Sequence, residues 1–137
     1  MRRYYIDTCI WRDYFEDRRD KFRPLGEWAL RMLRAIIEDN DIILYSEIVE
    51  DELRKAYSQK EITDIFSLVP PEIFIKVEIS ENQRKEAFYL SRKLKMFFKD
   101  VLHAVLARDN NALLVSRDKH FYELQEYVEI KRPEDLI

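Results

Sequence analysis

The sequence predicts an α/β fold with a parallel sheet, and two patterns support this. Short apolar segments of strand length alternate along the chain with longer segments whose apolar residues recur at helical spacing. The strand-like segments are continuous apolar runs, which is typical of strands covered on both faces. Strands that alternate with helices in this way favour an α/β architecture. With 137 residues, no internal repeat and no linker, we expect one domain over residues 1–137.

The first third of the chain contains two predicted strands and two predicted helices. Residues 3–6 are aromatic and apolar, and we expect a strand there that ends at Asp7. Residues 8–17 follow as a helix. Residues 24–40 carry apolar side chains at i, i+3, i+4 and i+7 with a proline at their entry, as in an amphipathic helix. Residues 41–45 are expected to be a strand, because after Asp41 they are continuously apolar.

The middle of the chain continues this alternation. Ser46 is placed to cap a helix over residues 47–58, and a further helix over residues 61–68 is expected to stop before two consecutive prolines. Residues 73–79 are strand-like. Residues 80–95 begin with a serine followed three residues later by glutamine, which is the capping-box pattern at the start of a long helix.

The last third of the chain contains shorter elements. Residues 100–108 are expected to form a helix, and residues 112–115 a buried strand after an Asn-Asn turn. Residues 118–125 follow as a short helix. Residues 127–130 are expected to be the last strand, and residues 132–135 a terminal turn of helix.

The composition excludes several classes of protein. Hydrophobic residues make up 47% of the chain and charged residues 37%, so it is expected to be globular rather than disordered. No apolar run is long enough to cross a bilayer, and the first residues lack the apolar stretch of a signal peptide. The single cysteine, Cys9, allows no intramolecular disulfide and no cysteine zinc site. These features favour a cytoplasmic protein.

Charge and glycine content limit how the chain binds phosphate. The single glycine, Gly26, leaves no phosphate-binding loop of the P-loop or Rossmann type. The formal net charge is −3, so binding to nucleic acid would need a local basic surface. Residues 81–99 are one candidate, and a solvated helix face is an equally good interpretation. The basic residues of this segment are Arg84, Lys85, Arg92, Lys93, Lys95 and Lys99.

Four acidic residues are expected to meet at one edge of the sheet. In open α/β sheets, ligands bind at the carboxyl ends of the strands. Asp7 ends the first strand, Asp118 lies just beyond the fourth, and Glu52 lies within two helical turns of the end of the second. Asp100 begins a helix that runs antiparallel to the strand it feeds, which brings it to the same edge.

These acids also have structural interpretations. Asp100 and Asp118 are each placed to cap the helix that follows. Glu52 has Glu50 and Asp51 beside it, so a solvated helix face is an alternative, and the identity of the second acid stays open among these three residues. Independent helix caps have no reason to share one edge of a sheet, and this favours a common site.

A divalent cation would stabilise such a cluster. Four carboxylates within a few ångströms repel one another, and some would otherwise take up protons. Their hard oxygen atoms suit Mg²⁺ or Mn²⁺, and the sequence offers neither cysteines nor paired histidines for zinc. A cation held in this way leaves positions open for phosphate oxygens and an attacking water, as in nucleases and phosphatases.

Five segments of the chain, in order, resemble the PIN-domain nucleases, including the VapC-type toxins of toxin–antitoxin pairs. The segments are YIDTCI at 5–10, SEIVEDEL at 46–53, DVLHAVLA at 100–107, LVSRDKHF at 114–121, and VEI followed by RPEDL within 128–136. Together they span nearly the whole chain. Residues 95–99, KMFFK, depart from the family by being bulkier and more basic than the turn expected before the third acid.

The resemblance implies a three-layer α/β/α sandwich around a parallel sheet of about five strands. It also implies that the chain cleaves RNA endonucleolytically with Mg²⁺ or Mn²⁺. In that case Asp7, Glu52 and Asp100 are the central metal ligands, and Asp118 is the fourth acid, bound directly or through water. For a toxin of this family, the resemblance further implies an antitoxin partner and a homodimer.

The same resemblance implies roles for several other residues. Ser46 and Ser116 stand where the family often has a small hydroxyl residue, so we expect them to support the metal ligands or to contact phosphate. Lys119 and His120, beside Asp118, are placed to contact RNA phosphate.

His103 and the aromatic residues have a structural interpretation first. His103 lies one turn after the third acid, where the family pattern indicates a structural role rather than a general base. Four aromatic residues are expected to be core or dimer contacts, with base stacking as the alternative. They are Phe88, Tyr89, Phe97 and Phe98.

Two other function classes are alternatives to a nuclease. One is a non-catalytic PIN domain that binds RNA or docks a protein, and titration with metal distinguishes it. The other is a phosphoryl-transfer domain with Asp7 as nucleophile, which is disfavoured because Cys9 stands where a second aspartate is expected. The sequence therefore predicts a metal-dependent endoribonuclease that hydrolyses RNA phosphodiester bonds.

Overall fold

The computed structural model describes residues 1–137 and has a central sheet of five parallel strands in the order β3-β2-β1-β4-β5. The central strand β1 pairs with β2 on one side and with β4 on the other. The strands are β1 (Arg3–Ile6), β2 (Ile42–Tyr45), β3 (Phe74–Lys76), β4 (Leu113–Val115) and β5 (Ile130–Lys131).

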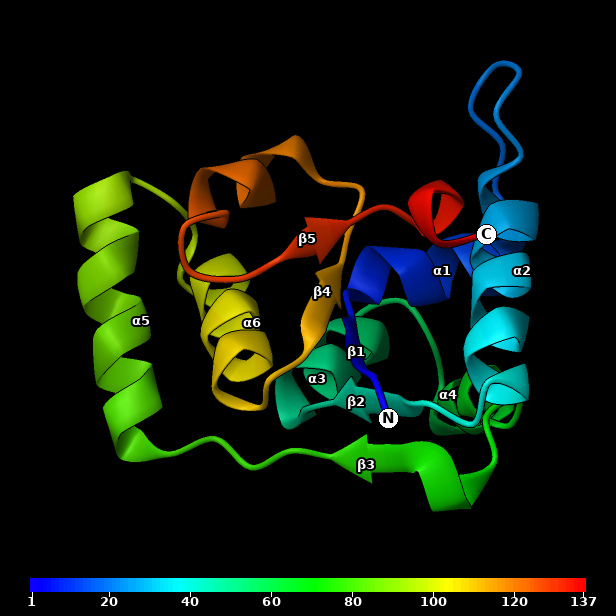
Figure 1. Ribbon diagram of the computed structural model, residues 1–137, viewed down its shortest axis with the longest axis horizontal. Helices are drawn as coiled ribbons and strands as arrows, with labels where there is room; N and C mark the ends of the chain where they lie inside the picture. The colour runs from blue at the N-terminus through cyan, green and yellow to red at the C-terminus, as the bar shows by residue number, and fades with distance from the viewer.

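Helices cover both faces of this sheet. The pair α5 and α6 lies on one side, and α1 and α2 lie on the other (Figure 1). The expected three-layer sandwich is confirmed. The α-helices are α1 (Thr8–Glu16), α2 (Leu25–Glu38), α3 (Glu47–Arg54), α4 (Gln59–Phe66), α5 (Glu81–Leu94) and α6 (Phe98–Asp109). The 3-10 helices are η1 (Pro71–Ile73), η2 (Lys119–Leu124) and η3 (Pro133–Leu136).

The continuous apolar runs of the sequence form the centre of the core. Because the sheet is covered on both faces, successive strand residues are buried whichever way they point. The fully buried strand residues include Tyr5, Ile6, Ile43, Leu44, Leu114 and Val115. They belong to one hydrophobic cluster together with the inner faces of the helices. None of the helices combines the length and the apolar character needed to cross a membrane.

Helix starts follow the predicted capping chemistry in part. The capping box at the start of α5 is confirmed: the Ser80 amide donates to Gln83 Oε1 at 2.8 Å, and the Gln83 amide donates to Ser80 Oγ at 3.1 Å. Ser46 occupies the N-cap position of α3, but its side chain makes no capping hydrogen bond. Its hydroxyl is instead hydrogen-bonded to the Tyr5 hydroxyl.

Several boundaries differ from the prediction: α3 ends at Arg54 rather than at residue 58, α4 covers Gln59–Phe66 rather than 61–68, and β3 is shorter than the expected 73–79. Two further differences have identifiable reasons. Residues 127–129 were expected to be in the last strand, but the Tyr127 and Val128 amides donate to the Leu124 carbonyl, which keeps them in the turn after η2. The helix expected from Asp100 begins two residues earlier, with Phe97 at its N-cap position. Asp100 therefore lies in the first turn of α6, and its interpretation as the helix cap is wrong.

Candidate active site

Asp7 is fixed at the carboxyl end of the central strand. It follows β1 directly, stands at the N-cap position of α1, and is 7% exposed. Its Oδ2 accepts hydrogen bonds from the Ser116 hydroxyl at 2.8 Å and the Cys9 thiol at 3.0 Å. Neither donor approaches Oδ1. One carboxylate oxygen is therefore held in place while the other has no hydrogen-bond partner in the chain.

Glu52, in the second turn of α3, is held by a buried hydrogen-bond chain. His103 Nε2 lies 2.6 Å from Glu52 Oε1, and the Thr8 hydroxyl donates to the same oxygen at 3.2 Å. Because an ionised carboxylate only accepts, Nε2 carries a proton. The other ring nitrogen, Nδ1, lies 2.7 Å from the Tyr5 hydroxyl, which in turn lies 2.7 Å from Ser46 Oγ.

The hydrogen bonds to Glu52 favour its ionised form. Burial acts to raise the pKa of Glu52, but the hydrogen bond and charge of His103, the Thr8 hydroxyl and the charge of Lys99 outweigh it, so the pKa is lowered. His103 and Ser46 are both fully buried. Ser46 thus has no access to phosphate, and its position suits the other expected role, that of supporting a ligand. His103 likewise orients Glu52, as its structural interpretation predicted.

Asp100 has a different environment. It projects from the first turn of α6 and accepts no hydrogen bond from the chain. Burial, followed by the nearby negative charge of Asp7, raises the pKa of Asp100 to about 6. The charges of Asp118 and Glu52 act in the same direction, whereas His103 opposes them. The ionised form of Asp100 is therefore disfavoured, first by burial and then by the neighbouring carboxylates.

Asp118 is both a helix cap and a member of the cluster. It stands at the N-cap of η2, where its Oδ1 accepts the His120 amide at 2.9 Å. Ser116 joins it to Asp7, because the Ser116 hydroxyl accepts the Asp118 amide at 3.1 Å and donates to Asp7. The capping interpretation and the site interpretation of Asp118 are therefore compatible.

All four predicted acids line one cavity of about 470 Å³ at the carboxyl edge of the sheet. Glu50 and Asp51 do not line it: Glu50 pairs with Lys76 and Asp51 with Arg54. Lys119 is exposed and also lies outside the lining. The lining residues are Asp7, Thr8, Cys9, Arg12, Arg18, Glu52, Lys55, Ala56, Asp100, Asp118 and Phe121.

The donor set of this cavity suits a hard divalent cation. Hydrogen bonds occupy one oxygen each of Asp7, Glu52 and Asp118, and neither oxygen of Asp100. Five carboxylate oxygens thus have no hydrogen bond from the chain, and such oxygens are the preferred ligands of Mg²⁺ and Mn²⁺. No three acidic, histidine or cysteine side chains lie close enough to hold one ion as they stand. Binding therefore requires the carboxylates to draw together.

Two residues of the site were missed by the sequence analysis. Thr8 hydrogen-bonds Glu52, and Lys55 lines the cavity without a salt bridge to any acid. Lys55 lies three residues after Glu52, on the same helix face, and that spacing is a signal that the sequence contains. Thr8 gives no such signal, because its contact with Glu52 joins elements far apart in the chain.

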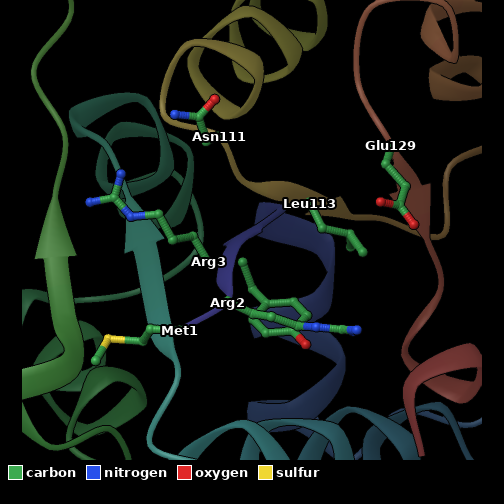
Figure 2. A pocket seen from close by; sticks show the side chains of 7 residues that line it. Met1, Arg2, Arg3, Asn111, Leu113 and Glu129 are labelled. Carbon is green, nitrogen blue, oxygen red and sulfur yellow. The ribbon is translucent and has the colours of Figure 1, made fainter.

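A second cavity of about 470 Å³ lies at the opposite edge of the sheet, around the start of β1 (Figure 2). Volume alone therefore does not identify the functional site. This cavity contains one carboxylate, that of Glu129, so the cluster of acids is what distinguishes the site at the carboxyl edge. The residues that line the second cavity are Met1, Arg2, Arg3, Tyr4, Asn111, Leu113 and Glu129.

Comparison with solved structures finds the same fold in toxin–antitoxin complexes. A VapBC2 complex of Rickettsia felis bound to a promoter DNA fragment contains a similar chain, with a TM-score of 0.70, 17% identity, and coverage of 95% of this chain and 98% of that one. A toxin–antitoxin complex of Klebsiella pneumoniae gives 0.68 and 21%, with 94% and 96% covered. VapBC-1 of nontypeable Haemophilus influenzae gives 0.66 and 20%, with 96% and 98% covered.

The sequence itself identifies the family. No curated protein matches the chain. The model of the PIN domain family, however, matches residues 4–127, which include all four acids of the cavity. The chain therefore belongs to the PIN domain family.

Proposed function

We propose that this PIN domain is an endoribonuclease that depends on Mg²⁺ or Mn²⁺ and hydrolyses RNA phosphodiester bonds. The observation that carries the proposal is the arrangement of the four acids. Each lines the same cavity, and each keeps at least one oxygen free of hydrogen bonds from the chain. Asp7, Glu52, Asp100 and Asp118 would hold the cation.

The chain supplies orientation and charge for this chemistry. Ser116 and Cys9 fix Asp7, and the chain from Ser46 through Tyr5 and His103 fixes Glu52. When bound, the cation polarises the phosphodiester and makes water a better nucleophile near neutral pH. Lys55 at the rim is placed to contact a phosphate of the strand. In-line attack by water would leave a 5′-phosphate and a 3′-hydroxyl.

Incubation with mixed RNA in the presence of Mg²⁺, with and without EDTA, tests this function. We expect cleavage with Mg²⁺, loss of cleavage with EDTA, and recovery when Mg²⁺ is added in excess. The fragments should carry 5′-phosphates, because metal-activated water is the nucleophile. Fragments ending in a cyclic phosphate would indicate attack by the RNA itself and contradict the proposal. Absence of cleavage with Mg²⁺ and also with Mn²⁺ would favour the non-catalytic alternative.

We further propose that the chain is the toxin of a toxin–antitoxin pair, in the cytoplasm, and that it pairs with an antitoxin and with a second copy of itself. The support is that the similar structures come from toxin–antitoxin complexes. Phe88 and Tyr89 on α5 are 56% and 62% exposed, so they are not core residues. Their interpretation as contacts between copies therefore stays a prediction.

A further inference from the structure

A smaller cavity of about 280 Å³ adjoins the acid cavity and shares one wall with it. Asp100 lines both cavities. The two are also joined through His120, which lines the smaller cavity and whose Nδ1 lies 2.9 Å from Oδ1 of Asp118 in the larger one. The residues that line the smaller cavity are Leu94, Lys95, Met96, Phe97, Asp100, His120 and Glu123.

Phe97 is the unusual member of this lining. Met96 and Phe98, on either side of it in sequence, pack against the hydrophobic core, whereas Phe97 is 80% exposed. Leaving a phenyl ring in water is unfavourable. Of the two roles expected for Phe97, that of a core contact is wrong, and that of a dimer contact stays a prediction. Its ring is instead available at the mouth of a cavity that borders the candidate metal site.

The turn that presents Phe97 has a defined conformation. Lys95 ends α5 in the left-handed region, with φ 56°, and its amide donates to the Ser91 carbonyl. The Met96 amide donates to the same carbonyl at 3.0 Å. Phe97 then takes an extended conformation as the N-cap residue of α6. These hydrogen bonds define the backbone from which the Phe97 ring projects.

The chemistry of the smaller cavity matches a nucleobase with its backbone. Leu94, Met96 and Phe97 provide apolar surface. The polar lining consists of the exposed Lys95 and His120 together with the carboxylates of Asp100 and Glu123. Lys95 makes no salt bridge that would neutralise its charge. Single-stranded RNA is bound in such places, because an unpaired base stacks on an aromatic ring while cations meet the phosphates.

We propose that the smaller cavity binds one base of single-stranded RNA, stacked on Phe97, beside the phosphodiester held in the acid cavity. Because Asp100 lines both cavities, the two subsites are adjacent. This inference rests on the proposed ribonuclease function and adds how the substrate strand is held. It gives the bulky segment at residues 95–99 a role in binding RNA rather than in contact with a second copy.

Cleavage kinetics of Phe97→Ala test the inference. Loss of one stacking contact is expected to raise KM about tenfold, since base–aromatic stacking contributes about 1 to 3 kcal/mol. Phe97→Trp should restore the wild-type KM, because its ring also stacks. The matched control is Phe22→Ala: Phe22 is 99% exposed, in the loop between α1 and α2 that projects away from the sheet, and this variant should cleave normally (Figure 1).

Substrates that lack a base provide a second readout. Cleavage of an RNA with one abasic position next to the scissile phosphate should be insensitive to Phe97→Ala, because the partner of the ring is already absent. If Phe97→Ala raises the KM of the abasic RNA as much as that of the intact RNA, base stacking is contradicted. An unchanged KM in Phe97→Ala would overturn the inference. A change in molar mass by light scattering with KM unchanged would also overturn it, in favour of a second copy covering Phe97.

Failure of this inference is distinguishable from failure of the proposed function. If the wild-type protein does not cleave RNA, the binding of fluorescein-labelled decauridylate can be followed by fluorescence anisotropy with Ca²⁺ as the cation. Phe97→Ala should then weaken binding by about tenfold relative to wild type and Phe22→Ala. Equal affinity of all three proteins would reject the base subsite whether or not the chain is a nuclease.

Discussion

Replacing Asp7 by asparagine is expected to lower the rate of Mg²⁺-dependent RNA cleavage by at least about a thousandfold. A bound cation contributes several kcal/mol to the stabilisation of charge in the transition state, and each 1.36 kcal/mol is about a factor of ten in rate. Asp7 lies at the end of the central strand and offers its free oxygen to the cavity. An amide is a much weaker ligand for Mg²⁺ than a carboxylate.

The fold should survive this substitution. Asparagine has nearly the same shape as aspartate, and its carbonyl oxygen still accepts the hydrogen bond from Ser116. Initial rates with Mg²⁺ in excess measure the effect, with circular dichroism as the check on folding. Asp51→Asn is the matched control, since Asp51 is exposed, pairs with Arg54 and lies outside the cavity. A rate in Asp7→Asn within tenfold of wild type would contradict the assignment.

Replacing Asp100 by asparagine is expected to stabilise the metal-free protein at about pH 7.5. The raised pKa of Asp100, about 6 against an ordinary 3.8, means that its ionised form is disfavoured in the folded state. The corresponding free energy has an upper limit of about 3 kcal/mol. Solvent partly screens the charge, so we expect a gain of about 1 to 2 kcal/mol, or roughly 5 °C in melting temperature.

The gain in stability of Asp100→Asn over the wild type should depend on pH. Below about pH 4, Asp100 is protonated in both the folded and the unfolded chain, so the variant and the wild type should be equally stable. Between pH 4 and 6, the unfolded chain ionises first and the wild type loses stability relative to the variant. Above pH 6 the difference stays constant. Thermal unfolding in EDTA across this range measures it, and a variant less stable than wild type at pH 7.5 would contradict the account.

Mg²⁺ should reverse the order of the two proteins. A cation that binds only the folded state adds about 2.7 kcal/mol when present at 100 times its dissociation constant. The wild type has all four proposed ligands, whereas Asp100→Asn lacks one of them. The wild type is therefore expected to become the more stable protein in Mg²⁺, and Asp51→Asn should respond to Mg²⁺ as the wild type does.

The parallel sheet and the meeting of the acids were predictable because they follow from periodicity and topology. Continuous apolar runs such as residues 42–45 indicate strands buried on both faces, and parallel strands bring their carboxyl ends to one edge. That rule places Asp7 and Asp118 together without any knowledge of side-chain contacts. The structure brings them together, with Ser116 bonded to both.

The finer details depend on tertiary contacts that no local pattern contains. The choice of Glu52 over Asp51 depends on which way α3 faces. This is set by burial of the apolar face of α3 in the core and by the contact of Glu52 with His103. Ser46 stands at the position of a helix cap, but its hydroxyl forms a hydrogen bond with Tyr5 of another strand. In the sequence, Gly26 as the single glycine indicates only that there is no glycine-rich phosphate-binding loop. In the structure, a Cβ at Gly26 would lie 2.5 Å from Asp17 Cα, so the contact between α1 and α2 requires glycine there.

The central claim is that carboxylates from four separate segments share one cation. The most direct test is anomalous diffraction from crystals of the protein soaked in MnCl₂. We predict one strong peak in the acid cavity, about 2.1 Å from oxygens of Asp7 and Asp100, with Glu52 and Asp118 bound directly or through water. A clear map with no manganese in that cavity, or with manganese bound only elsewhere on the chain, would contradict the account.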